Sequence, residues 1–276
     1  MKSLAAAFYV FVYRVFHLLH SGSQSLFEGF WLGLLPESVT DLVSERSYGE
    51  GTSYTGAAYL NSGLQFWEEI AIDRFFIPGC GVLVAAAGGG RELIALARRG
   101  YAAEGFDCCR TMVSAGKRAL SERGIDARIE WAPPCRIPEN LGTWDAAIIG
   151  WNGYTYISPR GRRIEFMKSL RAHLRPNSPV LVSGAIRPGK SGQLIWTPRI
   201  ANAVRVLTFR RPVFGTGSCF PGRPRHQFTR RELEEELAEA GFSPVAFWRW
   251  GPFGAVVCLN GEAPEQPVGS GASPAV

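Results

Sequence analysis

Residues 82–93, VLVAAAGGGREL, join an apolar run, three successive glycines and the start of a polar stretch within twelve positions. The apolar run is short and flanked by glycines, which is typical of a strand buried on both faces of a sheet. Residues 91–99 then place Leu93, Ile94 and Ala97 on one helical face, and Gly100 ends the pattern. The segment therefore predicts a buried strand, a tight turn and a helix in direct succession.

The same alternation of strand and helix continues to residue 259. Further strands are predicted at 101–107, 125–131, 143–151, 178–185, 243–250 and 253–259, and helices at 110–124, 161–176 and 229–242. Strands that alternate with helices favour right-handed crossovers and a parallel sheet, whereas the last two strands, joined by GPFG, form a hairpin. The fold class is therefore α/β: a doubly wound, mostly parallel seven-stranded sheet with an antiparallel terminal hairpin strand and helices on both faces.

We divide the chain into three parts. Residues 1–43 are a helical N-terminal extension, residues 44–260 form the main domain, and residues 261–276, rich in Gly, Pro, Ser and Ala, are a disordered tail. Within the main domain, residues 186–225 are far longer than an ordinary connection and are expected to form a lid containing a short helix near 198–208. Residues 44–69, with several aromatic side chains among glycines, are expected to cover a ligand.

The N-terminal segment 4–20, LAAAFYVFVYRVFHLLH, is very apolar but is interrupted by Arg14. It is shorter than the roughly 18 to 20 uninterrupted apolar residues of a membrane span, and no cleavage site of a signal peptide follows. In a helix, Arg14, His17 and Ser21 would form one narrow polar stripe. The favoured interpretation is a helix packed over the domain or its substrate mouth. Contact with a membrane surface or a second copy is the next alternative, followed by a signal or a span.

The composition sets limits on the class of protein. With 46% hydrophobic and 20% charged residues and a net charge of +6, the chain is an ordinary globular protein. The basic residues are spread too thinly to predict nucleic-acid binding. The six cysteines form no CxxC pair and no zinc-ligand spacing with the four histidines, so no metal site is expected. Free thiols suit a cytoplasmic location, with a peripheral membrane contact left open.

The glycine turn is a candidate ligand site. In an open parallel sheet, ligands bind beyond the carboxyl ends of the strands. Gly88 and Gly90 lack Cβ atoms, so the backbone can approach a ligand, and the following helix offers free N–H groups. Asp107, at the end of the second strand, can accept two hydrogen bonds from ribose hydroxyls. A dinucleotide fingerprint would need Gly or Ala where Leu93 stands, which disfavours nicotinamide and flavin cofactors.

Residues 82–259 resemble the class I S-adenosylmethionine-dependent methyltransferases. The resemblance rests on the order of the strands, the glycine turn, the acidic end of strand two, TWDAAII entering strand four, and RHQFTRRELEEELAEAGF before the final hairpin. It implies S-adenosyl-L-methionine as the cofactor. The implied cofactor-binding positions are Ala86, Gly88 and Gly90 around its methionine part, Asp107 at its ribose, Pro133 near its adenine and Gly150 near its methyl group.

Three positions depart from the pattern of the family. Val84 stands where an acidic residue usually ends strand one, and Ala86 replaces the first glycine. Alanine is tolerable there if its φ is below zero. Pro133 stands where an acidic residue often meets the adenine amino group, so we expect adenine to be held by stacking on Trp131, by the backbone of Cys135 or by packing against Ile137.

The segment GWNGYTYI after strand four is expected to face the methyl group. Trp151 and Tyr154, with Tyr48 and Tyr54 from the covering segment, are the predicted substrate-binding residues, because aromatic walls suit a planar or apolar acceptor. The predicted catalytic residues are Asn152, to orient the acceptor, and His226, as a base. Gly153 breaks the signature of methyltransferases that act on amino groups of bases or amides.

The sequence thus predicts a methyltransferase of a small-molecule partner, with O-methylation expected and N-methylation left open. Two alternatives stay open at this point. One is a methyltransferase of a lipid or quinone-like acceptor at a membrane surface, which the apolar N-terminal segment motivates. The other is a non-catalytic cofactor-fold binding protein, which Val84 and Pro133 motivate.

Overall fold

The computed structural model describes residues 2–49, 54–187, 189 and 191–261. Its helices are α1 (Lys2–Leu34), α2 (Glu37–Gly49), α3 (Ala57–Leu60), α4 (Phe66–Phe75), α5 (Arg91–Arg98), α6 (Arg110–Glu122), a 3-10 turn (Gly153–Tyr156), α7 (Arg160–Arg171), α8 (Gly192–Leu207) and α9 (Arg230–Glu239). Of the predicted disordered tail at 261–276, residues 262–276 lie outside the described residues.

Seven strands form one sheet in the order β3-β2-β1-β4-β5-β9-β8. Their bounds are β1 (Gly81–Ala85), β2 (Ala102–Asp107), β3 (Arg128–Trp131), β4 (Ala146–Ile149), β5 (Pro179–Ala185), β8 (Phe242–Trp250) and β9 (Phe253–Asn260). β1 pairs in parallel with both β2 and β4, whereas β9 is antiparallel to β5 and β8. The predicted seven-stranded, mostly parallel sheet with an antiparallel hairpin strand is therefore confirmed. Two further strands, β6 (Ser218–Cys219) and β7 (Arg225–His226), form a small separate ribbon.

The sheet is buried on both faces because successive side chains of its central strands enter different cores. Val82 and Val84 of β1 pack with α4, α5 and α6, while Leu83 and Ala85 pack on the opposite face with α7 and α9. All four side chains are fully buried. An uninterrupted apolar strand is the sequence signature of this three-layer arrangement.

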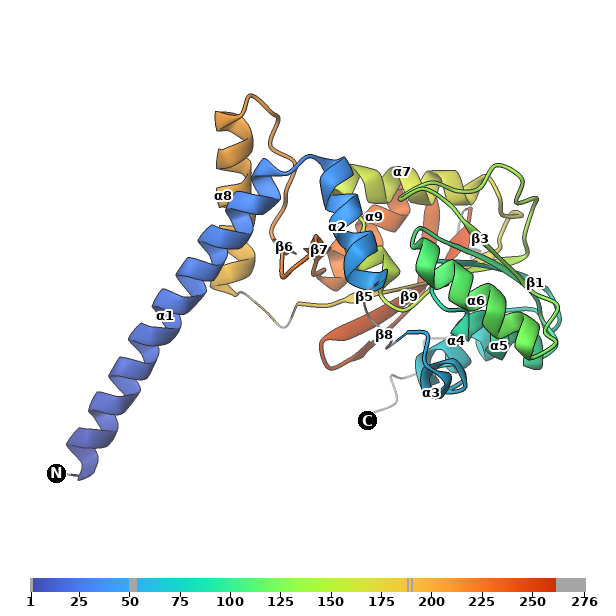
Figure 1. Cartoon of the computed structure of the whole chain (residues 1–276), viewed down its shortest axis with the longest axis horizontal. Coiled ribbons are helices and arrows are strands. Elements are labelled where there is room, and N and C mark those ends of the chain that lie inside the picture. Colours follow the sequence, from blue (N-terminus) through green and yellow to red (C-terminus); the bar gives the residue numbers. More distant parts are fainter. Residues whose placement is uncertain (1, 50–53, 188, 190, 262–276) are drawn as a thin grey trace.

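The structure places α1 differently from the favoured interpretation. The helix does not cover the main domain: its C-terminal half packs against α8, and its N-terminal half projects away from the sheet (Figure 1). Two glycines allow close packing, since a Cβ at Gly33 would lie 2.4 Å from the carbonyl oxygen of Ala201, and one at Gly29 would lie 2.7 Å from Ile200 Cβ. We call α1 and residues 192–211 together the arm.

Two expected bounds differ from those of the helices. In the predicted lid at 186–225, whose role as a lid stays a prediction, the helix expected near 198–208 is the longer α8, which packs against α1. The boundary expected at residue 43 falls inside α2, which packs against α6. Within the described residues, no helix combines the length and the apolar character that crossing a bilayer requires.

Candidate active site

A cavity opens at the carboxyl ends of β1, β2 and β4, where the sheet changes direction between β1 and β4. It encloses about 1150 Å³ together with its open mouth. The turn after β1 forms its floor, and the side chains Asp41, Ser44 and Tyr48 of α2 contribute to its lining. We call it the main cavity.

The glycine turn has the conformation that its composition predicts. Gly88 and Gly90 have φ values of +53° and +90°, in the left-handed region that favours glycine. The intervening Gly89 leaves room for another segment, since a Cβ there would lie 2.4 Å from the carbonyl oxygen of Tyr54. The condition set for Ala86 is not met, because its φ is +53°. This alanine therefore occupies a backbone conformation that costs an L-residue roughly 1 to 2 kcal/mol.

Asp107 is fixed by the backbone on both sides. One carboxylate oxygen accepts a hydrogen bond from Gly88 N at 2.9 Å, and the other accepts one from Cys109 N at 2.8 Å. Burial nevertheless raises the pKa of this carboxyl above its ordinary value. Each oxygen keeps a further lone pair, so the carboxylate can accept two more hydrogen bonds from a ligand in the main cavity.

A second buried carboxylate, Glu92, lines the main cavity from the first turn of α5. It shares the guanidinium of Arg91 with Glu68: Arg91 donates to Glu92 at 2.6 Å and to both oxygens of Glu68 at 2.8 and 2.6 Å. All three side chains are almost fully buried. Because two carboxylates share one cation, the cluster holds an excess negative charge, and burial raises the pKa of Glu68 to about 7.

Tyrosines form one side of the main cavity. Tyr48 of α2 contacts Tyr54 and Tyr156, with ring centroids 6.0 and 5.6 Å apart, and Tyr59 contacts Tyr54 at 5.4 Å. Arg223 lies over the rings of both Tyr48 and Tyr156, at 4.1 and 4.4 Å. Burial raises the pKa of Tyr48 well above its ordinary value, so its phenol is neutral at physiological pH.

Salt bridges hold α2 over the main cavity. Arg162 of α7 donates to the two oxygens of Asp41 at 2.9 and 2.8 Å, and Arg223 donates to Ser47 Oγ at 3.2 Å. These contacts join α2 to α7 and to the segment that carries Arg223.

The structure brings seven of the predicted site residues to the main cavity: Ala86, Gly88, Asp107, Pro133, Tyr48, Tyr54 and Trp151. Five others do not line it: Gly90, Gly150, Asn152, Tyr154 and His226. Tyr59, one of the aromatic residues of the covering segment 44–69, also lines the cavity. Sequence reasoning missed Glu92, although an acidic residue in the first helical turn after a glycine-rich loop is a recognisable signal.

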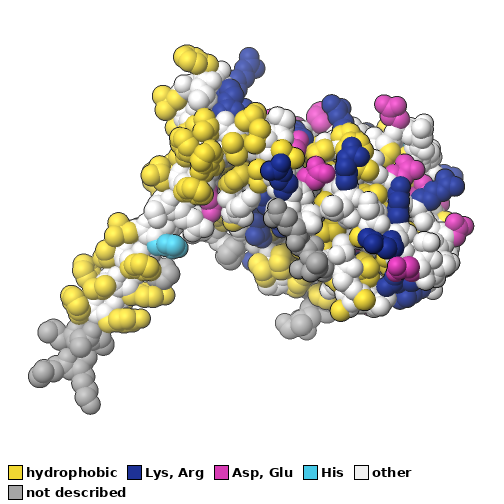
Figure 2. Space-filling model, viewed as in Figure 1, with side chains coloured by type: hydrophobic (Ala, Val, Ile, Leu, Met, Phe, Trp, Pro, Cys, Tyr) yellow, Lys and Arg dark blue, Asp and Glu magenta, His cyan; other side chains and the backbone are white. Residues whose placement is uncertain are grey.

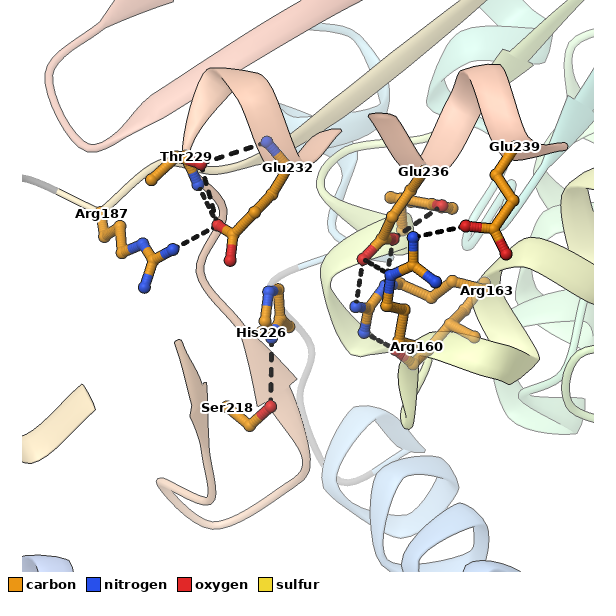
Figure 3. A network of polar contacts seen from close by, with 11 residues as sticks. Arg160, Arg163, Arg187, Ser218, His226, Thr229, Glu232, Glu236 and Glu239 are labelled. Atoms are coloured by element: carbon orange, nitrogen blue, oxygen red, sulfur yellow. Dashed lines mark hydrogen bonds and ion pairs between the residues drawn. The ribbon is translucent and has the colours of Figure 1, made fainter. Parts of the chain in front are cut away.

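His226 lies outside the main cavity, in the small β6–β7 ribbon (Figure 3). Its Nδ1 contacts Ser218 Oγ at 3.1 Å, and its ring packs edge-on against Phe228 at 4.6 Å. Burial, and secondarily the charges of Arg163 and Arg187, hold its pKa well below the ordinary value. The geometry gives this neutral, enclosed imidazole a packing role and does not support the predicted role as a base.

Tyr154 and Asn152 are also directed into the protein. Tyr154 is fully buried, and its hydroxyl donates to Glu236 at 3.1 Å. Glu236 is also paired with Arg163 (Figure 3). Asn152 is buried with a φ of +54°, and its backbone N–H donates to Ser183 Oγ at 2.9 Å. Its predicted role at the end of β4 is thus replaced by a turn position that asparagine tolerates.

Gly150 has a structural reason for being glycine. A Cβ there would lie 2.4 Å from the carbonyl oxygen of Ala86. Of the three groups expected near adenine, Cys135 lines the main cavity and Trp131 and Ile137 do not. The ring of Trp131 is covered on one face by Arg110, at 3.5 Å. Among the described residues, no group of His, Cys, Asp and Glu side chains could hold a metal ion.

Comparison with known proteins gives matches in structure. No family model and no curated protein matches the sequence. An S-adenosylmethionine-dependent methyltransferase from Methanosarcina mazei is similar with a TM-score of 0.54 and 16% identity, over 71% of this chain and 98% of that one. The 1,6-didemethyltoxoflavin-N1-methyltransferase of Burkholderia thailandensis, solved with 1,6-didemethyltoxoflavin and S-adenosylhomocysteine bound, is similar with a TM-score of 0.58 and 19% identity, over 82% and 90%.

The CcbJ methyltransferase from Streptomyces caelestis is similar with a TM-score of 0.57 and 12% identity, over 78% of this chain and 98% of that one. These likenesses extend over nearly the whole of each neighbour. At such low identity they concern the fold. The chain has the fold of the class I S-adenosylmethionine-dependent methyltransferases.

Proposed function

We propose that the protein is an S-adenosylmethionine-dependent methyltransferase acting on a small-molecule acceptor. The observation that carries the proposal is the pair of carboxylates, partly buried Asp107 and buried Glu92, beside the glycine turn of the main cavity. Ribose hydroxyls of a ligand could donate hydrogen bonds to Asp107, and a cationic group of the same ligand could pair with Glu92. Glu92 supplies to the main cavity a carboxylate of the kind that Val84 does not provide, which removes one of the two motives, Val84 and Pro133, for the non-catalytic alternative.

The residues present fit the cofactor. Asp107 would accept hydrogen bonds from the ribose hydroxyls, as its two backbone contacts leave lone pairs for them. Glu92 would receive the ammonium of the methionine part, because the cluster of Glu68, Arg91 and Glu92 has one carboxylate more than it has cations. A bound cation would balance that excess charge in a buried site, where the interaction is strong.

When bound, the cofactor would supply a methyl group from its sulfonium, and the protein's own residues would orient the acceptor and exclude water. Trp151, Tyr48 and Tyr156 would hold a planar acceptor by ring contacts. We keep oxygen as the expected methylated atom. Because His226 is not in the main cavity, we expect an acceptor hydroxyl that is acidic itself, such as a phenol or an enol. The structural neighbour from B. thailandensis, a methyltransferase of a small molecule, supports this size of acceptor.

Isothermal titration with S-adenosylhomocysteine tests the proposal. We expect Glu92→Gln to weaken binding roughly 10-fold or more, because a charge-assisted contact contributes about 1.5 to 3 kcal/mol. The variant should fold, since Arg91 keeps its paired contact with Glu68. Glu122→Gln, on the exposed surface of α6, is the matched control and should bind as the unchanged protein does. Absence of binding by the unchanged protein at millimolar concentration would refute the proposal.

A further inference from the structure

The arm exposes a continuous apolar stripe. Phe8, Val12, Val15, Leu19, Leu26 and Phe30 recur at intervals of three, four or seven residues along α1, and all of them are exposed. This spacing keeps them on one face of the helix over about 33 Å, at 1.5 Å per residue. In Figure 2, hydrophobic side chains gather along the arm.

The second helix of the arm extends this surface. Trp196 and Leu207 of α8 are exposed, and Phe209, just after the helix, is exposed completely. The two helices are held as a unit by a buried polar contact: Glu28 accepts hydrogen bonds from Gln193 Nε2 at 3.0 Å and from Phe220 N at 2.9 Å. Such a large exposed apolar surface on a well-packed unit is typical of an interaction site.

The charges of the arm are almost all positive. Its basic residues are Lys2, Arg14, Arg199, Arg205, Arg210 and Arg211, and its one acidic residue is Glu28. The Glu28 side chain is buried and hydrogen-bonded, so it presents no negative charge to a partner. Within the described part of the chain, Arg199, Arg205, Arg210 and Arg211 form no salt bridge. The arm therefore carries most of the chain's net charge of +6.

We propose that the arm binds the surface of an anionic lipid membrane, with α1 lying along the interface. Aromatic and aliphatic side chains would enter the boundary between headgroups and acyl chains, and the arginines would contact anionic headgroups. A second copy of the chain fits less well. A two-fold interface would place two cationic surfaces against each other, with no exposed carboxylate of the arm to pair with them. The proposal is independent of the proposed function, because it involves none of the cavity residues.

Vesicle co-sedimentation of the full chain tests the proposal. We expect binding to phosphatidylcholine vesicles that contain about 30% phosphatidylserine, weaker binding as salt increases, and at least 10-fold weaker binding to phosphatidylcholine alone. Equal binding to both kinds of vesicle would overturn the assignment of an anionic surface. No binding to either would overturn the whole proposal.

Two sets of variants test which residues carry the binding. Phe8→Ser, Leu19→Ser and Leu26→Ser combined should reduce vesicle binding at least 10-fold, whereas Ile77→Ser should not, although Ile77 is 73% exposed outside the arm. Unchanged binding by the triple variant would contradict the proposal. The variants should melt at the same temperature as the unchanged protein, because all of the substituted side chains are exposed.

Arg199→Gln with Arg211→Gln should reduce binding to the anionic vesicles several-fold. Lys117→Gln with Arg118→Gln, on the exposed face of α6, removes the same charge elsewhere and should have little effect. Equal losses in both pairs would indicate that only net charge matters and would overturn the assignment to the arm. Sedimentation equilibrium could instead show a dimer that the triple variant abolishes, without any binding to vesicles. In that case a second copy of the chain covers the apolar stripe, and the proposal is wrong.

Discussion

Single residues decide how the main cavity is built. The sequence predicts Gly88, Gly90 and Asp107 well, because a left-handed turn and an acidic strand end each leave a local signature. Ala86 shows the opposite case. The residue type of Ala86 alone does not reveal that its backbone has a φ of +53°. That angle depends on how the end of β4 and the 3-10 turn approach Ala86.

Ala86→Gly should stabilise the fold modestly. Relief of the left-handed alanine contributes roughly 1 kcal/mol, partly offset by the greater backbone entropy of glycine in the unfolded chain. We therefore expect the free energy of unfolding to rise by up to about 1 kcal/mol, as measured by urea denaturation. Ala87→Gly is the contrasting variant, because Ala87 is buried and has no positive φ. It should be destabilising, and a stabilising effect of Ala87→Gly together with none at Ala86 would contradict this explanation.

His226 should make stability depend on pH. Its folded-state pKa is held below the unfolded value, so protonation favours unfolding: the contribution is fully present above about pH 6.5 and is lost as pH falls toward the folded pKa. Over that interval the free energy of unfolding should drop by up to about 1.4 kcal/mol per pH unit more than in His226→Gln. Urea denaturation between pH 7.5 and 5 measures the difference. Parallel profiles for the two proteins would show that His226 is accessible to protons while folded.

At the scale of elements, the start of a helix is predicted where the nearby sequence marks it. The start is not predicted where it depends on contacts with residues distant in the chain. The helix predicted at 229–242 is α9, and it begins at a capping box, where Thr229 Oγ accepts from Glu232 N at 3.1 Å and Glu232 accepts from Thr229 N at 2.7 Å. α8 was expected near 198–208, yet it begins at Gly192. Pro198 cannot donate to the carbonyl of Leu194, and Gly217 N donates to it instead at 3.0 Å. No local pattern reveals a partner so distant in the chain.

Gly33→Val should separate the two helices of the arm. The added Cβ would lie 2.4 Å from a backbone oxygen of Ala201, which cannot move without shifting α8. We expect a loss of about 1 to 3 kcal/mol, measured as a lower melting temperature by circular dichroism. Gly22→Ala is the control in the same helix, because nothing lies within 4 Å of its Cβ position. It should stabilise α1 by roughly 0.5 to 1 kcal/mol, and equal destabilisation by both variants would refute the packing argument.

For the whole molecule, the alternating pattern of strands and helices predicts the sheet and a cavity at the carboxyl ends of its strands. The same pattern does not predict the arm. An apolar helix such as residues 4–20 needs a partner, but periodicity does not say which one. In the structure, the later part of α1 packs against α8 and its neighbours through Glu28, Gly29 and Gly33. The earlier part, from Phe8 to Leu19, keeps large side chains exposed.

Hydrogen exchange should therefore divide α1 into two parts. In the absence of lipid, amides of residues 8–20 should exchange at least 10-fold faster than those of residues 25–34, because tertiary packing protects the latter. Mass spectrometry of peptides from the full chain measures the difference. Uniform protection along the helix would show that residues 8–20 have a folded partner in solution.

The junction between α1 and α2 has a mechanical consequence. Only Leu35 and Pro36 separate the two helices, and the ring of Pro36 fixes its own φ, so this joint has little slack. Two side chains of α2, Asp41 and Tyr48, line the main cavity. We therefore expect a change in the direction of α1 to strain the ion pair between Asp41 and Arg162, which joins α2 to α7.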